Sequence, residues 1–282
     1  ISSSDWSSDV CSSDLEVPPG EDWNWLRSLH NSYHKWTQSS MYTWLSKATK
    51  PNYDPPKSKH VRRLILGTLR DEYETPLSIA KYSLQELEWR SDPRIAAKAL
   101  YIILLLLQYQ EDFKDSSDVV TYTNKIVAYY TDHIPTSEHL QIYSQAATRL
   151  GAIINSKITF HQMHLDVQGN FAVKNESICD KKFIEDLRSH LTCTLYETKG
   201  VQSLVKNSDD FLITVLWQPM VQETTSVYRL LRNLDDTKDQ LSTDTENLIG
   251  SLIDFPFISS TVVFPMPGEN VTVPRERFPK KI

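Results

Sequence analysis

The chain has 282 residues and a formal net charge of −6 at pH 7. This mildly acidic balance argues against nucleic acid as the main partner. Only 7 glycines occur, well below the roughly 7% that is average. The sequence contains no GxGxxG, P-loop or GxSxG motif, so nucleotide-dependent and lipase-type enzymes are disfavoured.

The first fifteen residues are not expected to belong to the fold. Residues 5–15 read DWSSDVCSSDL, which is the translation of a common sequencing adapter. We therefore treat residues 1–15 as a disordered translation artefact that replaces the true N-terminus. Excluding its three aspartates takes the formal net charge from −6 to −3. The remaining cysteines, Cys179 and Cys193, do not suggest a disulfide framework or a cysteine zinc site, so a reducing cytosolic compartment is expected.

Helical periodicity dominates the rest of the chain. Apolar residues recur at spacings of three and four from Trp23 to Trp36, which predicts an amphipathic helix that is either core or a membrane-wedging interfacial helix. Asp92 followed by Pro93 is a typical helix start. Further helices are expected near residues 41–47, 60–69, 76–89, 93–107, 117–131, 137–160, 181–206, 209–230 (with a kink at Pro219) and 241–255.

The segment Ala99–Leu107 is apolar on all sides. It is far shorter than the about 20 residues needed to span a bilayer, so it predicts the buried central helix of a domain. Residues 256–282 contain five prolines and are expected to form a mobile, Pro-rich tail. About nine helices with short connections and no strand periodicity predict an all-α fold, a superhelical stack of helices, without a fixed repeat period.

A basic motif lies between two of the expected helices. Lys47, Lys57, Lys59 and His60 are spaced as K-x(9)-K-x-K/R-H/Y, a pattern typical of phosphoinositide recognition. Pro55 and its neighbouring proline forbid a continuous helix, so the last three cations should open a new one. A helix start presents unpaired N–H groups and a positive dipole end, which favours a polyvalent anion. The alternative is a solvated basic turn.

This motif resembles the signature of the ANTH domain, the membrane-binding module of endocytic clathrin adaptors such as CALM and the huntingtin-interacting proteins. The resemblance extends over about residues 38–235 and is sharpest at 47–68. It implies an ANTH-like helical domain, which we assign to residues 16–255. The stretches 59–68 and 157–161 look more like the huntingtin-interacting branch.

The resemblance also implies a function. Phosphatidylinositol 4,5-bisphosphate, or a related bisphosphate, would be bound through Lys47, Lys57, Lys59 and His60, without a cofactor. The expected partners are the plasma membrane surface, clathrin coat components bound through flanking regions, and SNAREs or epsin-type adaptors. The expected location is cytoplasmic and peripheral, at the plasma membrane, clathrin-coated pits and endocytic vesicles.

Other classes of function have weaker support in the sequence. The main alternative is a helical protein-interaction scaffold that binds a peptide or SNARE without lipid specificity. His161, His164 and Asp166 are spaced closely enough to ligate a metal, but histidines at a helix end commonly contact terminal carbonyls. Cys179 and Cys193 have no partner motif and are expected to be ordinary thiols. We therefore predict neither catalytic residues nor a metal site.

Overall fold

The computed structural model of the protein describes residues 41–70, 75–174, 180–208, 210–235 and 239–251. Three sequence-based expectations lie outside these residues: the disordered segment 1–15, the amphipathic helix from Trp23 to Trp36, and the tail at 256–282.

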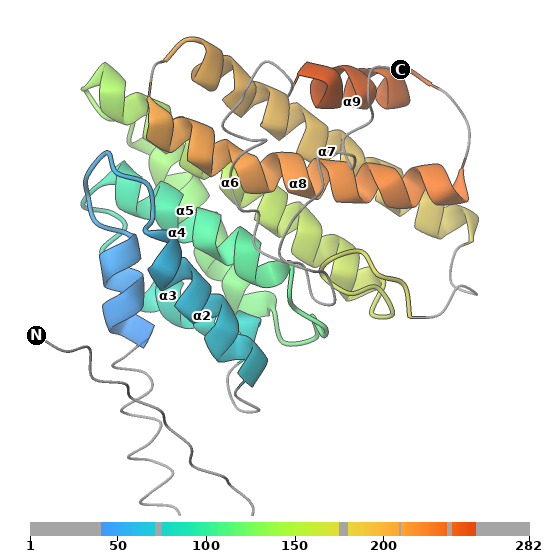
Figure 1. Ribbon diagram of the computed structural model, residues 1–282, viewed down its shortest axis with the longest axis horizontal. Helices are drawn as coiled ribbons and strands as arrows, with labels where there is room; N and C mark the ends of the chain where they lie inside the picture. The colour runs from blue at the N-terminus through green and yellow to red at the C-terminus, as the bar shows by residue number, and fades with distance from the viewer. Residues whose placement is uncertain (1–40, 71–74, 175–179, 209, 236–238, 252–282) are drawn as a thin grey trace, which may run out of the picture. The chain divides into compact units, whose positions relative to one another are not determined.

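The described chain is helical nearly throughout (Figure 1). After helical residues 41–48 come α2 (Ser58–Arg70), α3 (Pro76–Glu86), α4 (Pro93–Leu107), α5 (Ser117–Asp132), α6 (Glu138–Met163), α7 (Lys181–Lys206), α8 (Phe211–Leu234) and α9 (Gln240–Ser251). Within the described ranges, the one extended pairing is an isolated antiparallel bridge between Val167 and Val173. The predicted all-α fold is confirmed.

Side-chain caps fix where several helices begin. Asp92 takes an extended backbone and its Oδ1 accepts from the N–H of Arg94 at 2.8 Å, which confirms the predicted start of α4. An aspartate also caps each of α7 and α8, where Asp180 accepts from Phe183 N and Asp210 accepts from Leu212 N. Such caps satisfy N–H groups that the helix itself cannot bond.

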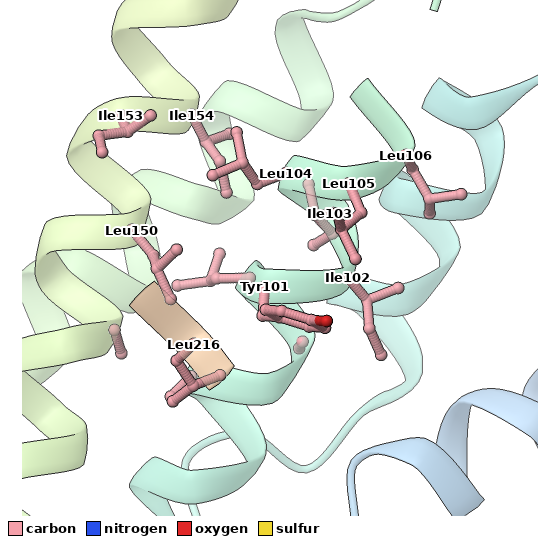
Figure 2. Close-up of a cluster of buried hydrophobic side chains, with 14 of the residues drawn as sticks. Tyr101, Ile102, Ile103, Leu104, Leu105, Leu106, Leu150, Ile153, Ile154 and Leu216 are labelled. Carbon is pink, nitrogen blue, oxygen red and sulfur yellow. The ribbon is translucent and has the colours of Figure 1, made fainter. Parts of the chain in front are cut away.

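Helix α4 is the buried helix that its composition predicts. Every residue from Ala96 to Leu107 is buried. Helix α6 packs against α4, α5, α7 and α8, and Figure 2 shows Leu150, Ile153 and Ile154 of α6 lying beside α4. Burying each such side chain contributes about 1.5–3 kcal/mol, so this contact anchors the stack. No helix among the described residues is long and apolar enough to cross a membrane.

Helix α3 ends earlier than its sequence predicts. The expected end was Trp89, but the helix stops at Glu86 and Leu87 takes an extended backbone, with φ −80° and ψ 136°. The indole Nε1 of Trp89 donates to Leu84 O at 3.2 Å. The chain therefore folds the bulky ring back over the last turn of α3, where it is buried.

Candidate anion-binding site

The predicted basic residues lie on two helical segments and the loop between them. Lys47 is exposed near the end of helical residues 41–48. Thr49 closes that helix, because both its N–H and its Oγ1 donate to Leu45 O at 2.9 Å. Lys57 and Lys59 are exposed at the start of α2. The structure therefore places the motif at a helix end and a helix start, as its prolines predicted.

The loop between the two segments is held from inside by Lys98 of α4. The Nζ atom of Lys98 donates to Lys50 O at 2.8 Å, and to the backbone and side-chain oxygens of Asn52 at 2.8 and 2.9 Å. Burial, and then the neighbouring Arg94, lowers the pKa of Lys98 to about 8. Three acceptors on one buried ammonium fix the path of the loop.

The first turn of α2 has no acidic side chain to neutralise the positive end of the helix dipole. The carbonyl of Lys57 accepts from the N–H groups of His60 at 2.8 Å and Val61 at 3.3 Å. The N–H groups of Ser58 and Lys59 precede the first intrahelical bond and point toward the helix start. The first turn contains no acidic residue. Backbone and side chains therefore present positive charge together.

His60 is the point around which the cations gather. It is only 7% exposed, and its Nδ1 is buried without a hydrogen-bond partner. Burial lowers the pKa of His60, and the cations Lys59, Lys47, Arg63 and Lys57 lower it further, in that order of size. The three predicted lysines thus lie near enough to His60 to act on its charge. A buried nitrogen without a partner is uncommon, and here it lies within a cluster of positive charge.

Arg63 belongs to this cluster although the motif does not include it. Its guanidinium carbon lies 5.8 Å from the centre of the Trp44 ring, a cation–π contact between α2 and the preceding helical segment. A signal for Arg63 existed in the sequence, since it follows His60 by three residues and therefore shares its face of α2. Trp44 precedes Lys47 by the same spacing.

The clustered cations have no acidic partners within the described part of the chain. The ion pairs found there use other cations, such as Lys81, Arg149 and Arg188. The nearest acid along the chain is Asp54, whose Oδ2 accepts from the side-chain amide of Asn52 at 2.8 Å. The described residues therefore leave the positive charge of the cluster unneutralised.

The histidines considered as metal ligands face different partners. His161 is buried and its Nδ1 donates to Val167 O at 3.0 Å, whereas Nε2 of His164 lies 2.9 Å from Asp186 Oδ2. No group of three or more His, Cys, Asp or Glu side chains in the described ranges could hold a metal ion. Cys193 is half-buried, and burial raises the pKa of its thiol, which disfavours a nucleophile. Cys179 lies outside the described residues.

A second group of charges is sealed inside the fold. Lys157 of α6 donates to Glu223 of α8 at 2.7 and 3.0 Å and to Gly169 O at 2.6 Å. His190 of α7 contacts the same carboxylate at 3.3 Å and receives a hydrogen bond of 2.7 Å from Ser156. A Cβ at Gly169 would lie 1.9 Å from Leu107 O, so only glycine fits there. These contacts tie three helices and the loop after α6 together.

Comparison with known proteins gives a similarity among solved structures. No known sequence family matches the chain. No curated protein matches it either. Among solved structures, a chain of the endocytic adaptor complex AENTH is similar, with a TM-score of 0.54 and 18% sequence identity over 79% of this chain and 93% of that chain. This similarity shows that the chain has the helical fold of ENTH and ANTH type, while the CALM or huntingtin-interacting branch stays a prediction.

Proposed function

We propose that this chain is a phosphoinositide-binding domain that recruits an endocytic clathrin adaptor to the membrane. The headgroup of phosphatidylinositol 4,5-bisphosphate, or a related bisphosphate, would be bound by Lys47, Lys57, Lys59 and His60. One observation carries the proposal: Lys47 at the end of helical residues 41–48 and Lys57 and Lys59 at the start of α2 are exposed, and all three act on the charge of His60.

The chemistry of the cluster suits a phosphorylated inositol ring. Lysine ammonium groups bind phosphate as point charges, and the first N–H groups of α2 add directed donors. Each charge-assisted hydrogen bond contributes about 1.5–3 kcal/mol. After the cost of ordering the lysines, affinity in the micromolar range is expected, where 1 μM corresponds to about −8 kcal/mol. Stable recruitment therefore needs a second membrane contact or several linked sites.

The fold supports the same proposed function. The similar solved chain belongs to an endocytic adaptor complex, which fits a role in membrane recruitment. We infer that the domain acts at the cytoplasmic face of the plasma membrane, in clathrin-coated pits and endocytic vesicles. Clathrin coat components would bind through flanking regions, and SNAREs or epsin-type adaptors are the expected protein partners.

The test is vesicle sedimentation with two matched double variants. Phosphatidylcholine vesicles containing phosphatidylinositol 4,5-bisphosphate are compared with phosphatidylserine vesicles of equal charge. We expect Lys57→Glu/Lys59→Glu to lose binding to the bisphosphate vesicles. Lys181→Glu/Lys182→Glu changes the net charge equally at another exposed helix start and should retain most of the binding.

Each other outcome has a definite meaning. Equal loss from the two double variants would show general attraction to an anionic surface instead of headgroup recognition. Unchanged binding by Lys57→Glu/Lys59→Glu would remove the lipid-binding proposal and favour the helical interaction scaffold. Neither double variant should melt at a lower temperature than the parent protein, as expected for exposed substitutions.

A further inference from the structure

Arg63 lies beside the proposed headgroup site without belonging to its sequence motif. It is exposed on α2, one turn after His60. Side chains three residues apart in a helix share a face. The same rule places Trp44 and Lys47 together on the preceding helical segment. The contact of 5.8 Å between Arg63 and the Trp44 ring therefore joins the two faces that carry the motif.

The charge of Arg63 acts on the same point as the motif lysines. It contributes more than Lys57 to the lowered pKa of His60, and no carboxylate of the described chain forms an ion pair with it. The adjacent Arg62 is also exposed, but it is not among the cations that lower this pKa. The two arginines thus differ in position while sharing charge and exposure.

We propose that Arg63 is a fifth headgroup-binding residue and binds a second phosphate of the inositol ring. This inference rests on the proposed function of the site. The guanidinium presents a rigid fork of donors that matches two phosphate oxygens, which a lysine ammonium cannot do. Trp44 acts as a positioning residue, because its ring holds the fork beside His60. The ligand class is an inositol ring carrying at least two phosphates.

Arg63 should therefore determine how strongly the site prefers a ligand with two phosphates to a ligand with one. A single phosphate can be satisfied by the lysines, His60 and the start of α2. A second phosphate needs another donor group at a distance from the helix start. Loss of Arg63 should weaken binding of a bisphosphate more than binding of a monophosphate, whereas a general loss of positive charge would weaken both.

The experiment compares Arg63→Gln with Arg62→Gln, which remove the same charge from neighbouring exposed positions of α2. Calorimetry measures binding of inositol 1,4,5-trisphosphate, and sedimentation compares vesicles containing phosphatidylinositol 4-phosphate or phosphatidylinositol 4,5-bisphosphate. We expect Arg63→Gln to lose roughly tenfold in affinity for the trisphosphate, equivalent to about 1.4 kcal/mol. Arg62→Gln should change little. Arg63→Lys keeps the charge and should recover only part of the loss, because the fork is missing.

Trp44 gives a second measurement that does not depend on charge. Trp44→Phe keeps an aromatic face and should bind nearly as the parent protein does, whereas Trp44→Leu should lose part of the preference for two phosphates. Equal effects of Arg63→Gln and Arg62→Gln, or an unchanged ratio of bisphosphate to monophosphate binding, would overturn the inference. A parent protein that binds none of these ligands would overturn the proposed function itself. Binding that needs Lys57 and Lys59 but not Arg63 overturns the role of Arg63 alone.

Discussion

The protein holds cations in two opposite ways. Lys157 is fully buried, and three hydrogen bonds from its Nζ go to Glu223 and Gly169. Lys47, Lys57 and Lys59 are exposed and form no ion pair within the described residues. A buried charge must be matched or it destabilises the fold. The charge of Lys157 therefore serves the stability of the fold. The three exposed lysines keep their charge for a partner outside the chain.

Lys98 lies between these two cases. It is buried like Lys157, but its three acceptors are two backbone carbonyls and the Asn52 side chain. Without a carboxylate in direct contact, its pKa falls to about 8, mainly through burial. It connects the core helix α4 to the loop that carries the exposed cations. The interior of the protein thus uses one lysine to fix a helix stack and another to shape the candidate site.

The largest expected effect comes from breaking the buried pair. Glu223→Gln keeps the shape of the side chain but leaves the Lys157 ammonium without its counter-charge. Removing one partner of a buried pair typically destabilises by about 3–5 kcal/mol, which is a large part of the 5–15 kcal/mol that stabilises a domain. Urea denaturation at pH 7 measures this loss.

A double-mutant cycle with Lys157→Met separates the pair from its surroundings. We expect the double variant to be more stable than Glu223→Gln alone, because no unpaired charge remains. Additive losses would mean that the two groups do not stabilise each other. Headgroup binding by every folded variant should match the parent protein, since this cluster is not part of the candidate site.

The second expected effect is a loss of stability in acid. Burial lowers the pKa of His190 and holds that of His161 well below its usual value. The unfolded chain therefore binds these protons at higher pH than the folded chain does. Stability is full above about pH 6.5 and falls with decreasing pH, by at most about 1.4 kcal/mol per pH unit for each histidine, until the pH passes the lowered pKa of the folded state.

Denaturant titrations at pH 7.5 and 5.5 measure this dependence. His161→Leu removes one titrating group and should make the pH dependence less steep, even if the variant is less stable overall. An unchanged slope would show that His161 is protonated in the folded protein. Glu223 acts in the same direction at lower pH: burial alone would raise its pKa, but Lys157 and His190 outweigh burial and lower it.

Binding at the candidate site should respond to acid in the opposite sense. Burial and four neighbouring cations lower the pKa of His60. A bound polyanion would raise it again, so binding takes up a proton and tightens as the pH falls toward and below 6.5. Calorimetry with inositol 1,4,5-trisphosphate at the same two pH values tests this by comparing the parent protein with His60→Asn. The phosphates of the ligand also titrate at about pH 6, so the variant should lose only the part of the dependence that comes from the histidine. Acid would then weaken the fold while strengthening binding.

Features encoded within one segment were predictable from the sequence. The bounds of α7, the capped start of α4 and its fully apolar run each follow from residues that are neighbours along the chain. The end of α3 was not predictable, because it depends on how the Trp89 ring packs. The four motif residues were predicted from their spacing, and their role in binding stays a prediction. The spacing of Arg63 from His60 placed the two on one face of α2, but the contact of Arg63 with Trp44 joins separate segments and appears only in the folded structure. The same holds for the contacts of Lys98 with the loop.

The smallest expected effect on stability is a slight gain at the candidate site. Lys59 lies in the first turn of α2, where no acidic residue stands and where the helix dipole disfavours positive charge. Lys59→Glu would reverse that interaction and relieve repulsion from Lys47 and Lys57. A gain of about 0.3–1 kcal/mol is typical of such a change at low ionic strength, and it should shrink with added salt.

The same variant should bind bisphosphate vesicles poorly, so stability and binding would move in opposite directions. A functional site often retains a destabilising arrangement of this kind. Lys182→Glu, at the exposed start of α7, is the matched control: it should raise stability similarly while leaving binding intact. If Lys59→Glu destabilised the protein, the lysine would have a structural partner, and its cluster would resemble the buried pair instead of contrasting with it.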